Sequence, residues 1–180
     1  MKKLIVLLTL LLVLSSFAIF ASSGYSNEGY IDIKAFISAL DKDYSFEVVG
    51  KDFGEDGLNL KGNPDILCTG DGVEVGSWIF NSENLTKDET FIVSYSYEPL
   101  RADVANFSFD YDIILLDRDR NLTEESDTTT FTATGSSSGK NDSEQRFVKV
   151  RLTEAATETL NDAPIDTYTS RITIELTSNS

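Results

Sequence analysis

Polar and apolar residues alternate along most of the chain after its first two dozen positions. In the segment 107–113, FSFDYDI, every second residue is apolar. A period of two is typical of an antiparallel strand with one face in the core and the other in water, whereas a helix repeats every three to four residues. The pattern therefore predicts a chain built mainly of β-strands, with helical periodicity nearly absent.

Similar alternation recurs at intervals separated by turn-forming residues. The expected strands are 31–37, 44–48, 66–69, 73–80, 91–97, 107–116, 128–134, 146–152 and 167–176. Gly76 is expected to mark a bulge that resets the alternation. The stretch 153–160 contains helix-favouring alanine and glutamate, but is short enough to be a single turn or a loop. About eight or nine strands predict an all-β fold, an immunoglobulin-like antiparallel β-sandwich, with a closed barrel as the alternative.

The first 23 residues have the order of a secretory signal peptide. Lys2 and Lys3 precede the apolar run 4–14, and small residues surround Ala21 and Ser23. We expect cleavage after Ser23, with cleavage after Ala21 as the alternative. An uncleaved membrane anchor is a second alternative, because the apolar character extends toward the roughly 18 residues that a spanning helix needs.

A signal peptide over residues 1–23 predicts an exported protein, periplasmic, secreted or at the cell surface, with one domain over residues 24–180. Its membrane contact is expected only through the signal peptide. The single cysteine, Cys68, excludes an internal disulfide bond. Because Cys68 shares a face with Ile66 in the expected strand 66–69, we interpret it as a core thiol, with an intermolecular link as the alternative.

Acidic residues outnumber basic residues by 30 to 15, which gives a formal net charge of −15. This charge makes nucleic acid and anionic lipid poor partners and favours bound cations. Asp117, Asp119 and Asn121 place oxygen atoms at alternate positions, which makes them calcium candidates. A solvated acidic loop without calcium is the alternative.

Residues for catalysis are scarce. The chain has no histidine and one cysteine, so neither a histidine-activated nucleophile nor the usual zinc ligand set can be assembled. No pair of carboxylates stands out, and we expect a protein that is not an enzyme and that needs no cofactor other than the calcium considered above. Trp78, Tyr95 and Tyr97 are candidates for a sugar-binding face, with core packing as the alternative.

The C-terminal segment 163–176, APIDTYTSRITIEL, resembles the final strand of fimbrial-type and spore-coat-type secreted β-sandwich domains, in which Thr-Tyr opens a last alternating strand. Asp166 stands where those domains usually have glycine. We expect Tyr168 and Ile172 on the core face of this strand. The resemblance implies a structural subunit that works by self-association.

The segment 29–37, GYIDIKAFI, lies at the start of the expected domain and alternates strictly. In pilins such a segment completes the sheet of a neighbouring subunit; an ordinary first strand is the alternative. The self-association candidates are Ile31, Ile33, Ala35 and Ile37. The leading hypothesis is a non-enzymatic structural or surface protein, fimbrial-like or coat-like, whose partner is itself or another envelope protein. The alternative is a secreted module that binds a glycan or a protein, with calcium bracing its loops.

Overall fold

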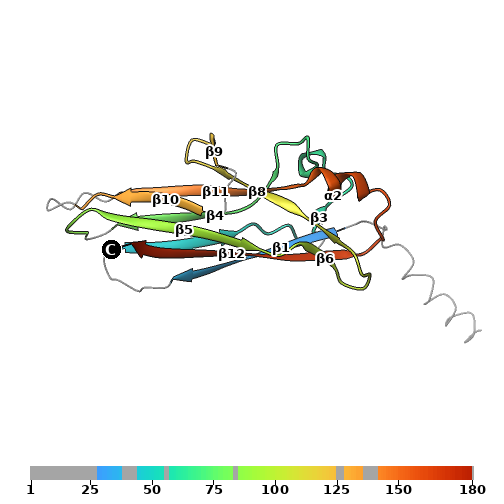
Figure 1. Ribbon diagram of the computed structural model, residues 1–180, viewed down its shortest axis with the longest axis horizontal. Helices are drawn as coiled ribbons and strands as arrows, with labels where there is room; N and C mark the ends of the chain where they lie inside the picture. Colours follow the sequence, from blue (N-terminus) through green and yellow to red (C-terminus); the bar gives the residue numbers. More distant parts are fainter. Residues whose placement is uncertain are drawn as a thin grey trace, which may run out of the picture.

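Two packed β-sheets contain most of the regular structure (Figure 1). The computed structural model describes residues 28–37, 44–54, 57–82, 85–124, 128–135 and 142–179. Within these residues it has 12 strands, a 3-10 turn and one short α-helix. The expected signal peptide lies outside the described residues, as do the first residues of the expected domain.

The first sheet, sheet A, has seven strands. Five follow the order β10-β5-β12-β1-β3, and β6 pairs with β12 and with β7. Their bounds are β1 (Glu28–Ile37), β3 (Leu58–Asn59), β5 (Glu89–Tyr97), β6 (Leu100–Ala102), β7 (Ser108–Phe109), β10 (Thr128–Ala133) and β12 (Thr167–Asn179). All pairs are antiparallel except β1 with β12, which is parallel.

The second sheet, sheet B, has five antiparallel strands in the order β2-β4-β11-β8-β9. Their bounds are β2 (Tyr44–Gly50), β4 (Val73–Ser82), β8 (Tyr111–Leu116), β9 (Leu122–Glu124) and β11 (Ser143–Leu152). The all-β sandwich prediction is confirmed. Eight strands have six or more residues, and the remaining strands are two or three residues long.

The inner faces of the two sheets form one core. Trp78 and Phe80 on β4 are fully buried, as is Phe91 on β5. The rings of Phe80 and Phe91 lie 4.6 Å apart between centroids, and the Trp78 indole donates a hydrogen bond of 2.7 Å to the Tyr95 hydroxyl. The expected bulge is present: the ladder between β11 and β4 shifts register next to Gly76.

The expected strand 66–69 is wrong. Residues Pro64–Ile66 form a 3-10 turn, η1, in which the Asn63 side chain accepts a hydrogen bond from the backbone of Asp65. Proline lacks an N–H donor and fits the first position of a helical turn, so a cap followed by Pro64 outweighs the short apolar run. Cys68, expected in the core, is a free thiol at a half-buried position.

The expected strand 107–116 is divided at Asp110. Before it, β7 pairs with β6 in sheet A; after it, β8 pairs with β11 in sheet B. The Asp110 carbonyl accepts a hydrogen bond of 3.1 Å from the backbone of Thr153. The alternation continues through the division because Phe109 and Tyr111 both face the shared core.

The segment 153–160 contains the α-helix α2 (Glu154–Thr159), with Thr153 as its N-cap. It lies at one end of the elongated sandwich, and the C-terminus lies at the other (Figure 1). The following strand, β12, has the expected faces: Tyr168, Ile172 and Ile174 are fully buried. The Tyr168 hydroxyl donates a hydrogen bond of 2.8 Å to the Pro164 carbonyl and anchors the corner before the strand.

Candidate functional site

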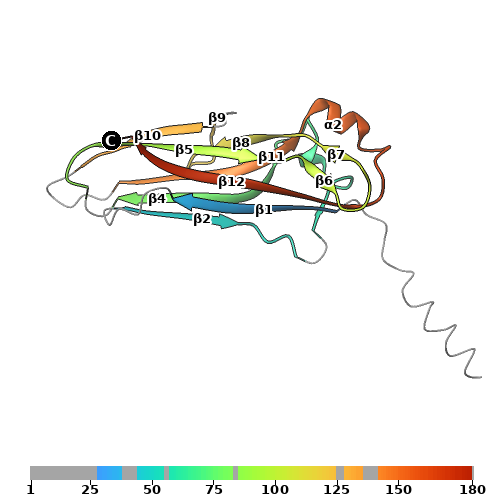
Figure 2. The ribbon, with the colours of Figure 1, turned by 60° about the horizontal axis from the view of Figure 1, so that its bottom comes forward.

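Strand β1 lies along one long edge of the sandwich, next to β2 of the opposite sheet (Figure 2). On one side it pairs with β12 over its whole length. On the other side only its first two residues, Glu28 and Gly29, pair with β3. The rest of that side has no strand partner among the described residues.

The self-association candidates line up with the buried positions of β12. The ladder places Ile31 opposite Ser170, Ile33 opposite Ile172, Ala35 opposite Ile174 and Ile37 opposite Leu176. Ile31 is 7% exposed, and Ile172, Ile174 and Leu176 of β12 are 0 to 1% exposed. The parallel ladder therefore places the alternate positions of β1 beside the buried row of β12.

The start of β1 is closely packed. A Cβ atom on Gly29 would lie 2.9 Å from a terminal methyl group of Leu60. Leu60 is fully buried and follows β3 directly. Because real Cβ contacts are almost never this short, the glycine lets β1 enter the sandwich between β12 and β3.

The calcium candidates lie in the hairpin turn between β8 and β9. The Asp117 carboxylate accepts hydrogen bonds from the backbone N–H groups of Asn121 (2.8 Å) and Asp119 (2.9 Å), and from the Asn121 side-chain amide. These bonds, the one from the Asn121 backbone first, lower the pKa of Asp117. No group of three or more acidic, cysteine or histidine side chains in the described part of the chain is arranged to hold a metal ion. Calcium binding therefore stays a prediction from the sequence.

The aromatic candidates do not form a sugar-binding face. Trp78 and Tyr95 are 0 and 4% exposed and are hydrogen-bonded to each other, whereas Tyr97 is 40% exposed. The Tyr97 ring contacts the ring of buried Tyr111, with 5.1 Å between centroids. Core packing, the alternative given above, accounts for the first two residues.

Asp166, in the connection that leads into β12, has a structural role. Its carboxylate accepts hydrogen bonds from the backbone N–H groups of Ala105 (2.7 Å), Val104 (3.1 Å) and Thr167 (2.8 Å). These bonds, the one from Ala105 first, lower the pKa of Asp166 below its ordinary value of 3.8. The carboxylate thereby ties the β6–β7 loop to the start of β12.

We expect Asp166→Asn to lower the unfolding temperature at neutral pH. We also expect the unfolding temperature of this variant to fall less steeply than that of the wild type as the pH is lowered. Because the folded-state pKa is lowered, the carboxylate stabilises the wild type fully above pH 3.8, and this contribution is lost as the pH falls through the folded-state pKa. Thermal unfolding followed by circular dichroism between neutral and strongly acidic pH measures both effects. Asp162→Asn, an exposed neighbour in the same connection, should follow the wild type. If the unfolding temperatures of Asp166→Asn and of the wild type fall equally steeply in acid, the stabilising role assigned to the Asp166 carboxylate is contradicted.

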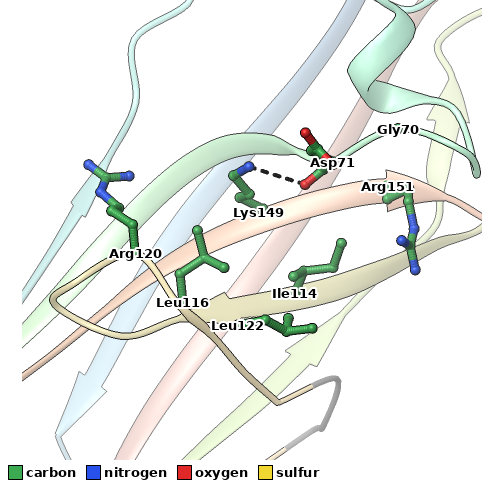
Figure 3. A pocket seen from close by; sticks show the side chains of 8 residues that line it. All are labelled: Gly70, Asp71, Ile114, Leu116, Arg120, Leu122, Lys149 and Arg151. Carbon is green, nitrogen blue, oxygen red and sulfur yellow. Dashed lines mark hydrogen bonds between the residues drawn. The ribbon is translucent and has the colours of Figure 1, made fainter.

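A pocket on the outer face of sheet B was missed by the sequence reasoning. Its volume is about 350 Å³, and it is formed by β8, β9, β11 and the loop before β4. Its lining residues are Gly70, Asp71, Ile114, Leu116, Arg120, Leu122, Lys149 and Arg151 (Figure 3). The outward positions Lys149 and Arg151 were one available signal. Their convergence with Arg120 depends on strand order, which alternation does not encode.

No helix in the described ranges is long and apolar enough to cross a membrane. The pKa values of Asp117 and Asp166 are lowered by bonds that close turns, and burial raises those of Tyr111 and Tyr168. Hydrogen bonds within turns and burial in the fold therefore account for these four pKa shifts. The chain matches no known protein family and no curated protein in sequence comparisons.

Proposed function

We propose that this protein is an exported structural subunit that self-associates by exchanging β1 between copies. In this proposal, β1 of one copy leaves its own sheet and pairs with β12 of the next copy. The supporting observation is the position of β1: beyond its first two residues it has a described strand partner on one side only, and that ladder runs beside the buried row Ile172, Ile174 and Leu176.

The energetics favour replacement of β1 over its simple loss. Full burial of one large aliphatic side chain is worth about 1.5–3 kcal/mol, so a bare β12 edge would expose several such side chains at a substantial cost. A second copy offers an identical strand with the same alternation. Exchange therefore restores the lost pairing, and the balance between closed and exchanged forms depends on concentration and on the connection between β1 and β2.

The arrangement of the strands also supports exchange of β1 without rearrangement of the other long strands. Strand β1 is the first described element and is joined to β2 only through residues 38–43. Sheet B and the β10-β5-β12 part of sheet A pair without it. Departure of β1 would remove the only ladder partner of the two-residue strand β3 within the described residues, whereas β12 would lose β1 but keep β5 and β6.

The test compares two single substitutions in β1 within the mature chain, residues 24–180. Ile33→Asp introduces a carboxylate opposite buried Ile172, and Lys34→Glu introduces one opposite Thr173 on the alternate face. Light scattering after size exclusion should show multimers for the wild type and for Lys34→Glu. Ile33→Asp should be monomeric, because a carboxylate at the position paired with buried Ile172 would oppose docking of the strand in either copy.

Two further measurements make the result decisive. A labelled peptide of residues 28–37 should be incorporated by the wild type and should reduce its multimers, and circular dichroism checks that each variant stays folded. The proposal fails if Ile33→Asp forms the same multimers as the wild type. It also fails if the wild type is monomeric at all concentrations, an outcome that would favour the binding module.

A further inference from the structure

Strand β1 ends, and β2 begins, at the end of the sandwich where the C-terminus lies (Figure 2). We call this the hinge end. In the unexchanged chain, Ile37 at the end of β1 lies opposite Leu176 of β12. Residues 38–43 then lead to Tyr44, the first residue of β2. The chain therefore leaves β1 and enters β2 at the same end of the sandwich.

The direction of the ladder between β1 and β12 determines how a strand from another copy can enter. A replacing strand must run parallel to β12, with its first residue opposite Thr167 and its last opposite Leu176. The last residue of the incoming strand then lies at the hinge end of the receiving copy. Because the connection to the donor's own β2 begins there, the body of the donor must lie next to that same end.

The register of the incoming strand is restricted as well. A slide by one residue would turn the alternating face of β1 away from the core. A slide by two residues would place Asn27 or Ile31 where Gly29 lies, and a Cβ atom at that position would be 2.9 Å from fully buried Leu60. The incoming strand therefore cannot lengthen its connection by sliding, and its Ile37 stays at the hinge end.

The connection between β1 and β2 is short. Residues 38–43 lie between the two strands, and a fully extended chain of this length spans at most about 25 Å, at roughly 3.6 Å per residue. The hinge ends of the donor and the receiver must therefore lie within about 25 Å of each other. A longer assembly would need the hinge end of a third copy within the same distance, where two bodies already meet.

We infer that the exchange is reciprocal and stops at two copies. This pairing rests on the exchange proposed above and specifies its partner: a second copy related by a two-fold axis, with the hinge ends facing and each β1 in sheet A of the other copy. Once one β1 has crossed, the second β1 lies within reach of the vacated β12, so its transfer occurs at a high effective concentration. The resulting pair is symmetric and leaves no β1 free to recruit a third copy.

A disulfide bond across the ladder between β1 and β12 reports which copy supplies the strand. Lys34 and Thr173 are ladder partners, and neighbouring strands are close enough for a disulfide bond. The variant Lys34→Cys, Thr173→Cys is made in a Cys68→Ser background and oxidised after assembly. Non-reducing denaturing electrophoresis should then show two linked chains. Ser96→Cys, Thr173→Cys in the same background joins β5 to β12 within one body, so this matched control should show single chains.

The reciprocal pairing and the exchange itself fail through different results. Linked species of two chains and no more support reciprocal exchange. A ladder of three, four and more linked chains that Ile33→Asp abolishes overturns the two-copy inference and leaves the exchange of β1 standing. If Lys34→Cys, Thr173→Cys forms disulfide bonds only within single chains at every concentration, β1 does not exchange and both proposals fall.

Discussion

Trp78→Ala is expected to lower the free energy of unfolding by about 3–5 kcal/mol, the range for truncation of a large buried aromatic side chain. Trp78 is fully buried at the centre of β4. Its ring lies 5.6 Å from that of Phe46 and 6.0 Å from that of Phe131, between centroids. The truncation would thus remove contacts with both sheets at once.

The loss also has a polar component. The Trp78 indole donates a hydrogen bond of 2.7 Å to the buried Tyr95 hydroxyl, which also lies 3.4 Å from the Thr129 hydroxyl. Trp78→Phe keeps most of the ring volume and removes the donor, so it should cost less than alanine.

Urea unfolding followed by far-ultraviolet circular dichroism measures these differences, because the chain has only one tryptophan and the variants lose its fluorescence. Val104→Ala, at a 91% exposed position, is the control and should behave as the wild type. If Trp78→Ala lowers the free energy of unfolding by less than Trp78→Phe does, Trp78 does not join the two sheets.

A second large effect is expected in alkali. Burial, first of all, raises the pKa of Tyr111 from 10.0 to about 12; the hydrogen bond with Ser170 opposes this shift, and the nearby Tyr97 and Glu98 add to it. The Tyr111 and Ser170 hydroxyls lie 2.8 Å apart, and Ser170 donates to the Glu98 carbonyl at 2.6 Å. The neutral phenol therefore links β8 of one sheet to β12 of the other.

The sign follows from the two ionisation states. Above pH 10 the unfolded chain loses the Tyr111 proton while the folded chain retains it, so stability falls as the pH rises toward the folded-state pKa of about 12. Two pKa units correspond to at most about 2.7 kcal/mol. Urea unfolding of the wild type and of Tyr111→Phe across this pH range measures the difference. Tyr111→Phe should have the shallower slope; a slope equal to that of the wild type would contradict the assignment. The raised pKa of Tyr168 leaves a residual slope in both proteins.

Most of the fold follows from the alternation of side chains. A period of two locates a half-buried strand wherever one face meets a core, so β4, β5, β11 and β12 were predicted within a few residues. The interpretation was wrong at residues 66–69 because local capping chemistry around Pro64 outweighed a short apolar run. Alternation also gave no sign of the division at Asp110, since both halves keep the same inward face.

Strand partners and directions were less predictable. The pattern of β1 marked Ile31, Ile33, Ala35 and Ile37, but it did not indicate a parallel ladder with β12. Parallel pairing depends on how the intervening chain brings β1 and β12 side by side, and the alternation within each strand does not encode this. The same limit applies to Arg120, whose stack on Phe147 joins a turn to a strand that follows later in the chain. Asp166 shows a third limit: its role depends on the N–H groups of a loop about 60 residues earlier.

The parallel ladder between β1 and β12 also sets the order in which the chain can fold. A chain synthesised from its N-terminus presents β1 first and β12 last, and the ladder joins Glu28 to Thr167 and Ile37 to Leu176. Contacts between segments so distant in sequence form late and slow folding. Sheet A can close only after β12 has been synthesised, so β1 lacks the partner of its ten-residue ladder while all the intervening strands are being made.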